Sequence, residues 1–170
     1  GSGEPGADGV SLATAQYTIR PARNDDSRFV YLLSSDPRIR AMSTRQEEFS
    51  WEDHEIWWKR RFNKRGTRIW VMEMGDVPVA QVRYGLIPHW HEGVPNPHGP
   101  PNEAEIAISV VPNKWRSGYA LALLQETMPL ARDWLEVDRL VALVLRQNWP
   151  SRRLFRKAGF RYIGVEERLI

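Results

Sequence analysis

The chain contains no cysteine among its 170 residues. This absence excludes disulfide bonds, thiolate metal sites and group transfer through a cysteine-bound intermediate. Long apolar runs are absent too, and none approaches the roughly 20 residues that a membrane-spanning helix needs. No secretory apolar segment stands near the start of the sequence. Together these absences favour a cytoplasmic protein that does not enter a membrane.

A strong excess of one charge is also missing. Lys and Arg number 24 against 21 Asp and Glu, which leaves a net charge of +3. Such a mild and dispersed charge favours an anionic ligand but does not predict nucleic-acid binding. The chain does have 42% hydrophobic residues, enough for one domain with a core, and eight tryptophans. Side chains as large and flat as tryptophan either fill a core or line a ligand cleft.

The sequence divides into a leader and one domain. Residues 1–15 are rich in Gly, Ser and Ala without a periodic apolar pattern, so we expect a disordered leader or the remnant of a tag. Residues 16–170 are expected to form a single domain. Alternation of apolar and polar residues predicts strands at 16–23, 68–74, 77–86, 103–111, 139–146 and 160–170. Helical periodicity and capping residues predict helices at 27–35, 51–62, 118–135 and 150–158.

Two local features qualify this pattern. Pro129 falls inside the longest predicted helix and should kink it or shorten its regular part. Residues 87–102 are rich in proline and glycine, and a loop of that length usually has a function. The order of elements contains no internal repeat and predicts an α/β fold with a mixed central sheet.

The most informative stretch lies where the strand at 103–111 ends and the longest helix begins. A strand followed by a glycine-containing turn and a helix gathers unpaired backbone N–H groups at the positive end of the helix dipole, where phosphates bind. Gly118 and Ala120 would allow close approach to the backbone, and Lys114 and Arg116 add positive charge. A plain strand–helix connection has the same pattern. We call residues 113–120 the anion seat.

This stretch resembles motif A of the Gcn5-related N-acetyltransferase (GNAT) superfamily, Val-x-Pro-x-x-Arg/Gln-x-x-Gly-x-Gly/Ala. The matching positions are Val110 or Val111, Pro112, Gly118 and Ala120, whereas Trp115 and Arg116 depart from the pattern. The sequence at 140–160, LVALVLRQNWPSRRLFRKAGF, resembles the family's motif B. Its matching positions are Asn148, Leu154, Lys157, Gly159 and Phe160. The resemblance covers residues 16–165 and implies a GNAT-like mixed, mostly antiparallel central sheet flanked by helices.

The resemblance also implies the cofactor acetyl-CoA and the residues that contact it. In the family, backbone amides of motif A hold the pyrophosphate of coenzyme A, and the motif B asparagine contacts the pantetheine region. The implied cofactor contacts here are Val110, Val111, Trp115, Arg116, Ser117, Gly118, Tyr119, Ala120, Asn148, Ser151 and Phe155.

Transfer of an acetyl group to an amine needs a base for the amine proton and a donor for the developing oxyanion. Glu103 and Glu105 lie two apart on a predicted strand and therefore face the same side. The family's Ala-Glu-Ile pattern points to Glu105. The resemblance places the oxyanion donor among the backbone N–H groups near Val110 or Val111.

The proton donor for the leaving thiolate is where the sequence departs from the family. Phe155 stands where a tyrosine is common, and it has no proton to give. Ser151, Tyr119 or a water could take that role, or the thiolate could leave unassisted. A coenzyme A thiol has a pKa of about 8.5, so unassisted departure costs little at neutral pH.

The helix at 51–62 resembles GNAT members that acetylate the 4-amino group of nucleotide-linked sugars. Their Ser-x-Glu-x-His-x-x-Trp arrangement corresponds to Ser50, Asp53 or Glu52, His54, and Trp57 or Trp58. The expected substrate contacts are Trp57, Trp58, His54, His89 and Trp90. Arg60 or Arg61 could meet a nucleotide diphosphate. His89 and His91 have no evident third ligand, so no metal site is expected.

These features predict an N-acetyltransferase that moves acetyl from acetyl-CoA to a primary amine of a small molecule, an amino sugar in the preferred interpretation. Two alternatives stay open. The Trp-x-x-Gly-Tyr-Ala variant of motif A suggests a ribosomal-protein-type N-terminal acetyltransferase, and Phe155 suggests an acyl-CoA-binding sensor without turnover. No nucleic-acid or membrane partner is expected, and the oligomeric state, a homodimer included, stays open.

Overall fold

The computed structural model describes residues 16–45, 47–87, 89–91, 94–96 and 102–164, with only the backbone described at 89–91 and 94–96. Its strands are β1 (Thr18–Pro21), β2 (Thr67–Met74), β3 (Val77–Leu86), β4 (His89–His91), β5 (Val94–Asn96), β6 (Glu103–Val110) and β7 (Arg139–Ala142). Its helices are η1 (Asn24–Asp26), α2 (Ser27–Ser35), α3 (Pro37–Arg40), α4 (Trp51–Arg61), η2 (Pro112–Lys114), α5 (Tyr119–Leu135) and α6 (Trp149–Lys157).

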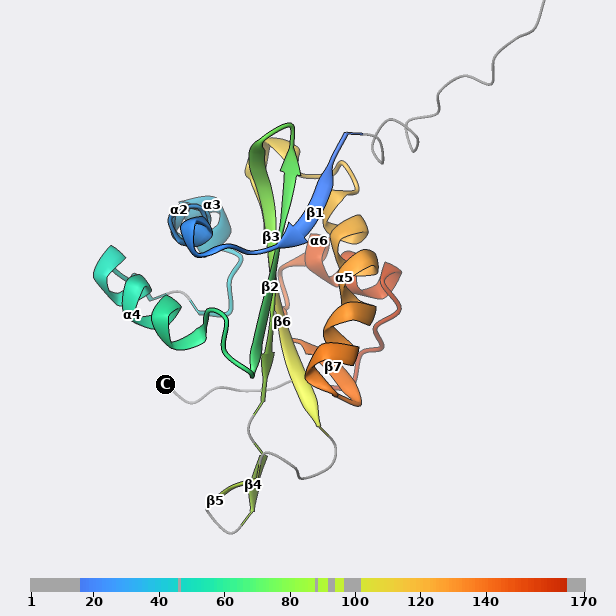
Figure 1. Cartoon of the computed structure of the whole chain (residues 1–170). Coiled ribbons are helices and arrows are strands. Elements are labelled where there is room, and N and C mark those ends of the chain that lie inside the picture. The colour runs from blue at the N-terminus through green and yellow to red at the C-terminus, as the bar shows by residue number, and fades with distance from the viewer. Residues whose placement is uncertain (1–15, 46, 88, 92–93, 97–101, 165–170) are drawn as a thin grey trace, which may run out of the picture.

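Five strands form one sheet in the order β1-β2-β3-β6-β7. All neighbours are antiparallel except β6 and β7, which run parallel. Helices α2, α3 and α4 cover one face of this sheet, and α5 and α6 cover the other (Figure 1). The predicted fold class, a mixed and mostly antiparallel sheet flanked by helices, is therefore confirmed.

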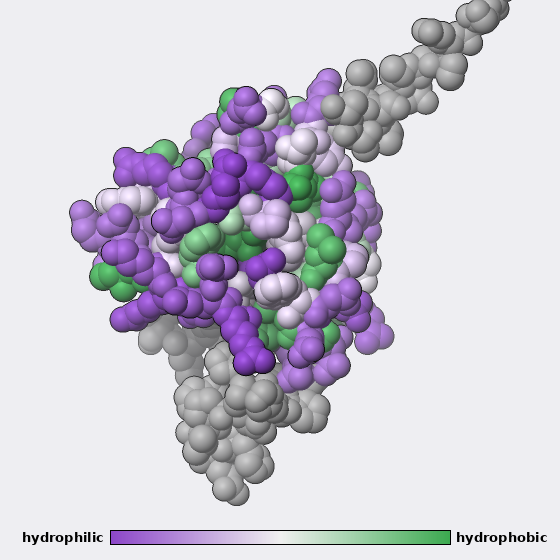
Figure 2. All heavy atoms as spheres, in the orientation of Figure 1, coloured by the Kyte–Doolittle hydropathy of each residue, from purple (hydrophilic) through white to green (hydrophobic). Residues whose placement is uncertain are grey.

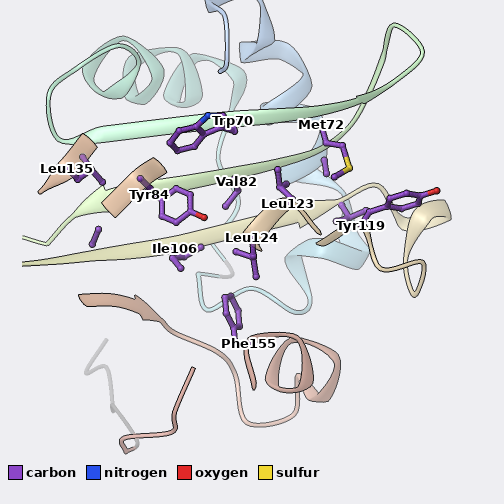
Figure 3. Close-up of a cluster of buried hydrophobic side chains, with 14 of the residues drawn as sticks. Trp70, Met72, Val82, Tyr84, Ile106, Tyr119, Leu123, Leu124, Leu135 and Phe155 are labelled. Carbon is purple, nitrogen blue, oxygen red and sulfur yellow. The ribbon is translucent and has the colours of Figure 1, made fainter. Parts of the chain in front are cut away.

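The main core lies between the sheet and α5. Alternate residues of β2, β3 and β6 point to this side and meet Leu123 and Leu124 of α5 and Phe155 of α6 (Figure 3). Leu123 and Leu124 are fully buried, and burial of each leucine contributes about 1.5–3 kcal/mol. Inside this layer the Tyr84 and Thr127 hydroxyl oxygens lie 2.7 Å apart, so the buried phenol is hydrogen-bonded.

The opposite face carries a smaller apolar cluster. Val30 of α2, Trp58 of α4 and Ile69 of β2 are its buried members. Helix α4 starts as the sequence predicts, because the Asp53 N–H donates to the Ser50 hydroxyl at 3.1 Å and the Ser50 N–H donates to the Asp53 carboxylate. This start fixes which side of α4 turns toward the sheet.

Several elements differ from the sequence-based expectation. The strand expected at 139–146 ends at Ala142, and residues 160–164 of the expected last strand form none; residues 165–170 lie outside the described part. Residues 161–164 are exposed, Tyr162 and Ile163 included, and pair with no strand of the described sheet. The loop at 87–102 contains the short antiparallel pair β4–β5, and α3 is an additional turn of helix.

Pro129 does not shorten α5, which continues for 17 residues. The proline lies on the exposed side of the helix. The carbonyl oxygen that loses its N–H donor can therefore be hydrated, which lowers the cost of the proline.

Candidate functional site

The sheet opens where β6 and β7 separate. Their pairing runs from Glu103 opposite Arg139 to Ile106 opposite Ala142, and β7 ends there. Strand β6 continues to Val110, still paired on its other side with β3. Within the part of the chain that the structure describes, no strand therefore lies beside the outer edge of residues 107–110. We call this the open edge of β6.

Backbone directions at the end of β6 separate the two candidate oxyanion donors. The Val111 N–H donates to the Val79 carbonyl oxygen at 2.8 Å and is therefore already occupied. Successive residues of a strand direct their N–H groups to opposite edges, so the Val110 N–H faces the open edge. The Val110 carbonyl oxygen accepts a hydrogen bond from the Trp115 indole at 2.7 Å. Val110 is thus the better placed donor.

The turn that follows β6 has the geometry of the anion seat. Arg116 and Gly118 both adopt positive φ, 62° and 81°, and the first hydrogen bond of α5 runs from the Ala122 N–H to the Gly118 carbonyl oxygen at 3.1 Å. In the described structure, the backbone N–H groups of residues 116–121 have no hydrogen-bond acceptor. The turn is exposed at Arg116, Ser117 and Gly118. These N–H groups, at the positive end of a long helix, can bind a phosphate.

Other residues expected at the cofactor serve the packing of α6 and α5. Asn148 is buried; its side-chain oxygen accepts from the Ser151 N–H at 3.2 Å, and its amide nitrogen donates to the Met42 carbonyl oxygen at 3.2 Å. It therefore ties the segment after α3 to the start of α6. Phe155 lies in the main core, edge-on to Phe160 with ring centres 5.1 Å apart. Tyr119 is also buried, which leaves Ser151 or water as the better proton donors.

The two candidate bases lie on the α4 side of the sheet, as their shared face predicts. The Glu103 carboxylate is 2.9 Å from the Arg139 guanidinium, so it is engaged in an ion pair. Glu105 of β6 lies opposite Gly85 of β3. Arg83 of β3 lies opposite Ala107, which is two residues after Glu105 on β6. Glu105 and Arg83 therefore share a face and lie diagonally across two strands, a Cβ separation of roughly 7–8 Å or less.

Arg83 is the functional candidate that the sequence-based analysis missed. Burial lowers the pKa of Arg83 to about 10, while the negative charge of Glu105 acts in the opposite direction. The side chain still carries its charge at neutral pH. Its signal in the sequence is an arginine in the middle of the apolar strand VPVAQVRYGL. Such a residue is costly to bury without a reason.

The aromatic residues of α4 divide into a contact for this site and members of the core. The Trp57 ring lies 4.8 Å from the Arg83 guanidinium. Trp58 is only 3% exposed and donates its indole N–H to the Asn24 side chain at 3.1 Å. His54 is 4% exposed, with its Nε2 atom 3.1 Å from the Ser27 hydroxyl.

The structure thus corrects the expected roles of Trp58 and His54, which pack inside the protein rather than facing a ligand. Helical periodicity identified an amphipathic helix but not which of its large residues turn inward. Trp57, which is half-buried, remains as the aromatic candidate of α4. The side chains of His89 and Trp90 lie outside the described residues.

Two surface depressions lie away from these residues. Their volumes are about 410 and 440 Å³, and both are bordered by Arg68 and Trp134. Arg68 pairs with Tyr84 and so faces the α5 side of the sheet, opposite Glu105. Figure 2 shows hydrophobic residues near the centre of the molecule in this view, with hydrophilic residues around them. Neither depression contains a candidate for the chemistry.

The described residues offer neither a metal site nor a membrane-spanning helix. They contain no group of three His, Asp or Glu side chains able to hold a metal ion. In the same residues, no helix has the length and apolar character needed to span a bilayer.

Comparisons with known proteins identify the family of the chain. The family model described as acetyltransferase (GNAT) domain matches residues 16–161. The chain is 34% identical over 104 residues to the uncharacterized N-acetyltransferase YoaA of Bacillus subtilis, covering 60% of this chain and 52% of that protein. It is 34% identical over 56 residues to the L-amino acid N-acetyltransferase AaaT of Escherichia coli, covering 32% and 35%. The matches thus span about half and about a third of these relatives' own lengths.

Solved structures share the fold. A spermidine N-acetyltransferase from Vibrio cholerae in complex with CoA and spermine superposes with a TM-score of 0.72 at 21% identity, covering 92% of this chain and 88% of that one. An aminoglycoside antibiotic 6′-N-acetyltransferase from Acinetobacter haemolyticus gives 0.62 at 15% identity, covering 90% and 99%. At such identities the likeness concerns the fold alone.

Proposed function

This chain belongs to the acetyltransferase (GNAT) domain family, and on that premise we propose that it transfers the acetyl group of acetyl-CoA directly to a primary amine of a small molecule. The observation that carries this proposal is the run of backbone N–H groups at residues 116–121, which have no acceptor in the described structure. They are suited to hold the diphosphate of coenzyme A, because they combine several hydrogen-bond donors with the dipole of a long helix.

The open edge of β6 continues from the anion seat and suits the reacting end of the cofactor. Acetyl-CoA supplies a thioester whose acyl carbon a neutral amine can attack. The Val110 N–H would donate to the acyl oxygen and stabilise the negative charge that develops there. This role requires no side chain, which fits the departures from the family pattern at Trp115 and Arg116.

Glu105 is the proposed general base. It would accept the proton of the attacking amine, directly or through one water, while the new C–N bond forms and the C–S bond breaks. The products are an amide and coenzyme A. Ser151 or water would protonate the thiolate; since that thiol has a pKa of about 8.5, unassisted departure also suffices. The choice of Glu105 over Glu103 rests on the Ala-Glu-Ile pattern of the family.

The finer proposal for the acceptor is an amino sugar, nucleotide-linked in the preferred form. Trp57 supports it, because a half-buried aromatic ring next to Arg83 can stack on a sugar or a nucleobase with its accessible part. The burial of His54 and Trp58 removes two contacts on which the resemblance depended. Three of the proteins named above are acetyltransferases of spermidine, L-amino acids and aminoglycosides, so an amine acceptor is common to these three.

The test is direct. Purified protein is titrated with acetyl-CoA by calorimetry, and thiol release is then measured with amino sugars, amino acids, polyamines and peptides. We expect micromolar-range cofactor binding and thiol release with a small amine. Release only with peptides would favour the N-terminal acetyltransferase alternative. Cofactor binding without release on any amine would favour a sensor, and absence of binding would contradict the anion seat.

A further inference from the structure

The guanidinium of Arg83 lacks hydrogen-bond acceptors among the described residues around it. In the described structure it makes no hydrogen bond and no ion pair; its recorded neighbour is the Trp57 ring at 4.8 Å. The Arg83 side chain is half-buried in the sheet. A guanidinium carries five N–H donors, and polar groups largely removed from water are nearly always hydrogen-bonded. An arginine held inside a sheet with its donors unused by the protein has them available for a ligand.

The charged side chains near Arg83 also favour a negatively charged ligand. Among the described residues, Glu105 is the negative charge that acts on the Arg83 guanidinium, whereas Arg45 and Arg61 act on it as positive charges. One negative and two positive side chains therefore act on the Arg83 guanidinium. Such a field attracts an anionic ligand and repels a polycation.

Arg83 lies close to Glu105, the proposed general base. Glu105 lies diagonally across from it on the neighbouring strand, at a Cβ separation of roughly 7–8 Å or less. A small molecule whose amino group lies beside Glu105 is therefore long enough to reach the Arg83 guanidinium with its other end. Planar, bidentate recognition of a carboxylate or phosphate is the task to which arginine is best suited.

We infer that Arg83 binds an anionic group of the acceptor, so that the acceptor is an amine with a carboxylate or a phosphate close to its amino group and not a polyamine. This inference rests on the proposed function and adds the substrate class. Trp57 then holds the guanidinium plane in place from the other side. An acceptor that carries a carboxylate would be an amino acid, and an acceptor that carries a phosphate would be a nucleotide-linked amino sugar.

The test uses pairs of amines that differ in the anionic group. Each common L-amino acid is paired with its amide, and a nucleotide-linked 4-amino sugar is paired with the methyl glycoside of the same sugar. Spermidine serves as the acceptor without an anion. Thiol release gives kcat and KM for the wild type, Arg83→Gln and Arg83→Lys, and circular dichroism reports folding. Arg68→Gln is the matched control, because Arg68 also lies near tryptophan rings but on the α5 face.

We expect the anionic member of at least one pair to have a kcat/KM about 10- to 100-fold above its neutral partner, the range of a charged hydrogen bond. Arg83→Gln should abolish that preference by raising KM for the anionic member, and Arg83→Lys should restore part of it. Arg68→Gln should leave the preference intact. Which pair shows the effect identifies carboxylate or phosphate.

Equal or better use of the neutral member or of spermidine would overturn the inference while leaving the proposed function standing. An unchanged preference in Arg83→Gln would also overturn it. If acetyl-CoA binds but no amine releases thiol, the proposed function is wrong. Calorimetric titration of the same pairs into protein saturated with coenzyme A then decides the inference, because equal binding of both members, or none, contradicts it.

Discussion

The two faces of the central sheet are built differently. The α5 face is a continuous apolar layer in which most large side chains of β2, β3 and β6 are buried. The α4 face has only three buried apolar residues in its cluster, and it carries the charged side chains of Arg83 and Glu105. The apolar core and the proposed catalytic residues thus lie on opposite sides of the same strands, since side chains alternate along a strand.

The largest effect should come from the α4 face, without loss of stability. Glu105→Gln is expected to lower kcat about 10²- to 10⁴-fold, the usual contribution of a general base. Affinity for acetyl-CoA and the free energy of unfolding should change little, because the amide has the same shape. Steady-state kinetics and calorimetry measure both. Glu103→Gln should have the smaller effect, and full activity of Glu105→Gln at saturating acceptor would remove it as the base.

The opposite pattern is expected on the α5 face. Leu124→Ala should lower the free energy of unfolding by about 3–5 kcal/mol, because the leucine is fully buried and leaves a cavity. Leu32→Ala is the matched substitution on the other side, where Leu32 is 54% exposed, and should cost below about 1 kcal/mol. Urea unfolding compares the two. Equal losses would mean that the faces do not differ as described.

The anion seat lies in the turn between β6 and α5, and Gly118 within it can be tested separately. Gly118→Val should raise the Kd for acetyl-CoA about tenfold or more, because a side chain at φ 81° costs about 1–2 kcal/mol and projects into the open space that the diphosphate needs. Gly75→Val is the control, because Gly75 has φ 61° and equally open space in the β2–β3 turn. Comparable weakening by both variants would point to general strain.

The smallest effect concerns the pH dependence of the α4 face. Burial lowers the pKa of His54 below its usual value near 6.5, so the folded protein keeps this imidazole neutral while the unfolded chain takes up a proton. Its contribution is complete above pH 6.5 and is lost as pH falls toward the folded pKa, at most about 1.4 kcal/mol per pH unit. His54→Gln should flatten this part of the stability profile in urea unfolding between pH 7 and 5. An unchanged slope would contradict the assignment.

The sequence predicted the framework of the molecule well. The β2–β3 hairpin, the capped start of α4 and the long helix after the anion seat follow from local signals: a Gly-Asp turn, a Ser-x-x-Asp box and a regular apolar repeat. The unpaired N–H groups of the seat follow from the same local geometry. The shared face of Glu103 and Glu105 follows from alternation along the strand. The choice of Glu105 as the base rests on the family's Ala-Glu-Ile pattern and stays a prediction.

What the sequence could not predict depends on contacts between distant segments. Periodicity does not tell that Trp58 meets Asn24 while Trp57 meets Arg83, since both tryptophans lie near the edge of the apolar side of α4. The early end of β7 depends on its separation from β6 rather than on its own residues. The side chain of Asn148 matched a cofactor motif, yet it contacts Met42, which is remote in sequence.

The indole of Trp115 has a consequence for the behaviour of the protein in solution. An unpaired strand edge inside a sheet is a template for aggregation, because another chain can add its own backbone there. The Trp115 indole N–H donates to the Val110 carbonyl oxygen, which is the last acceptor on the open edge of β6. An incoming peptide would find this terminal acceptor already used, so a backbone ladder could not extend past Ile108, whereas a thin linear ligand needs no such ladder. Trp115→Ala should therefore make the unliganded protein more prone to self-association.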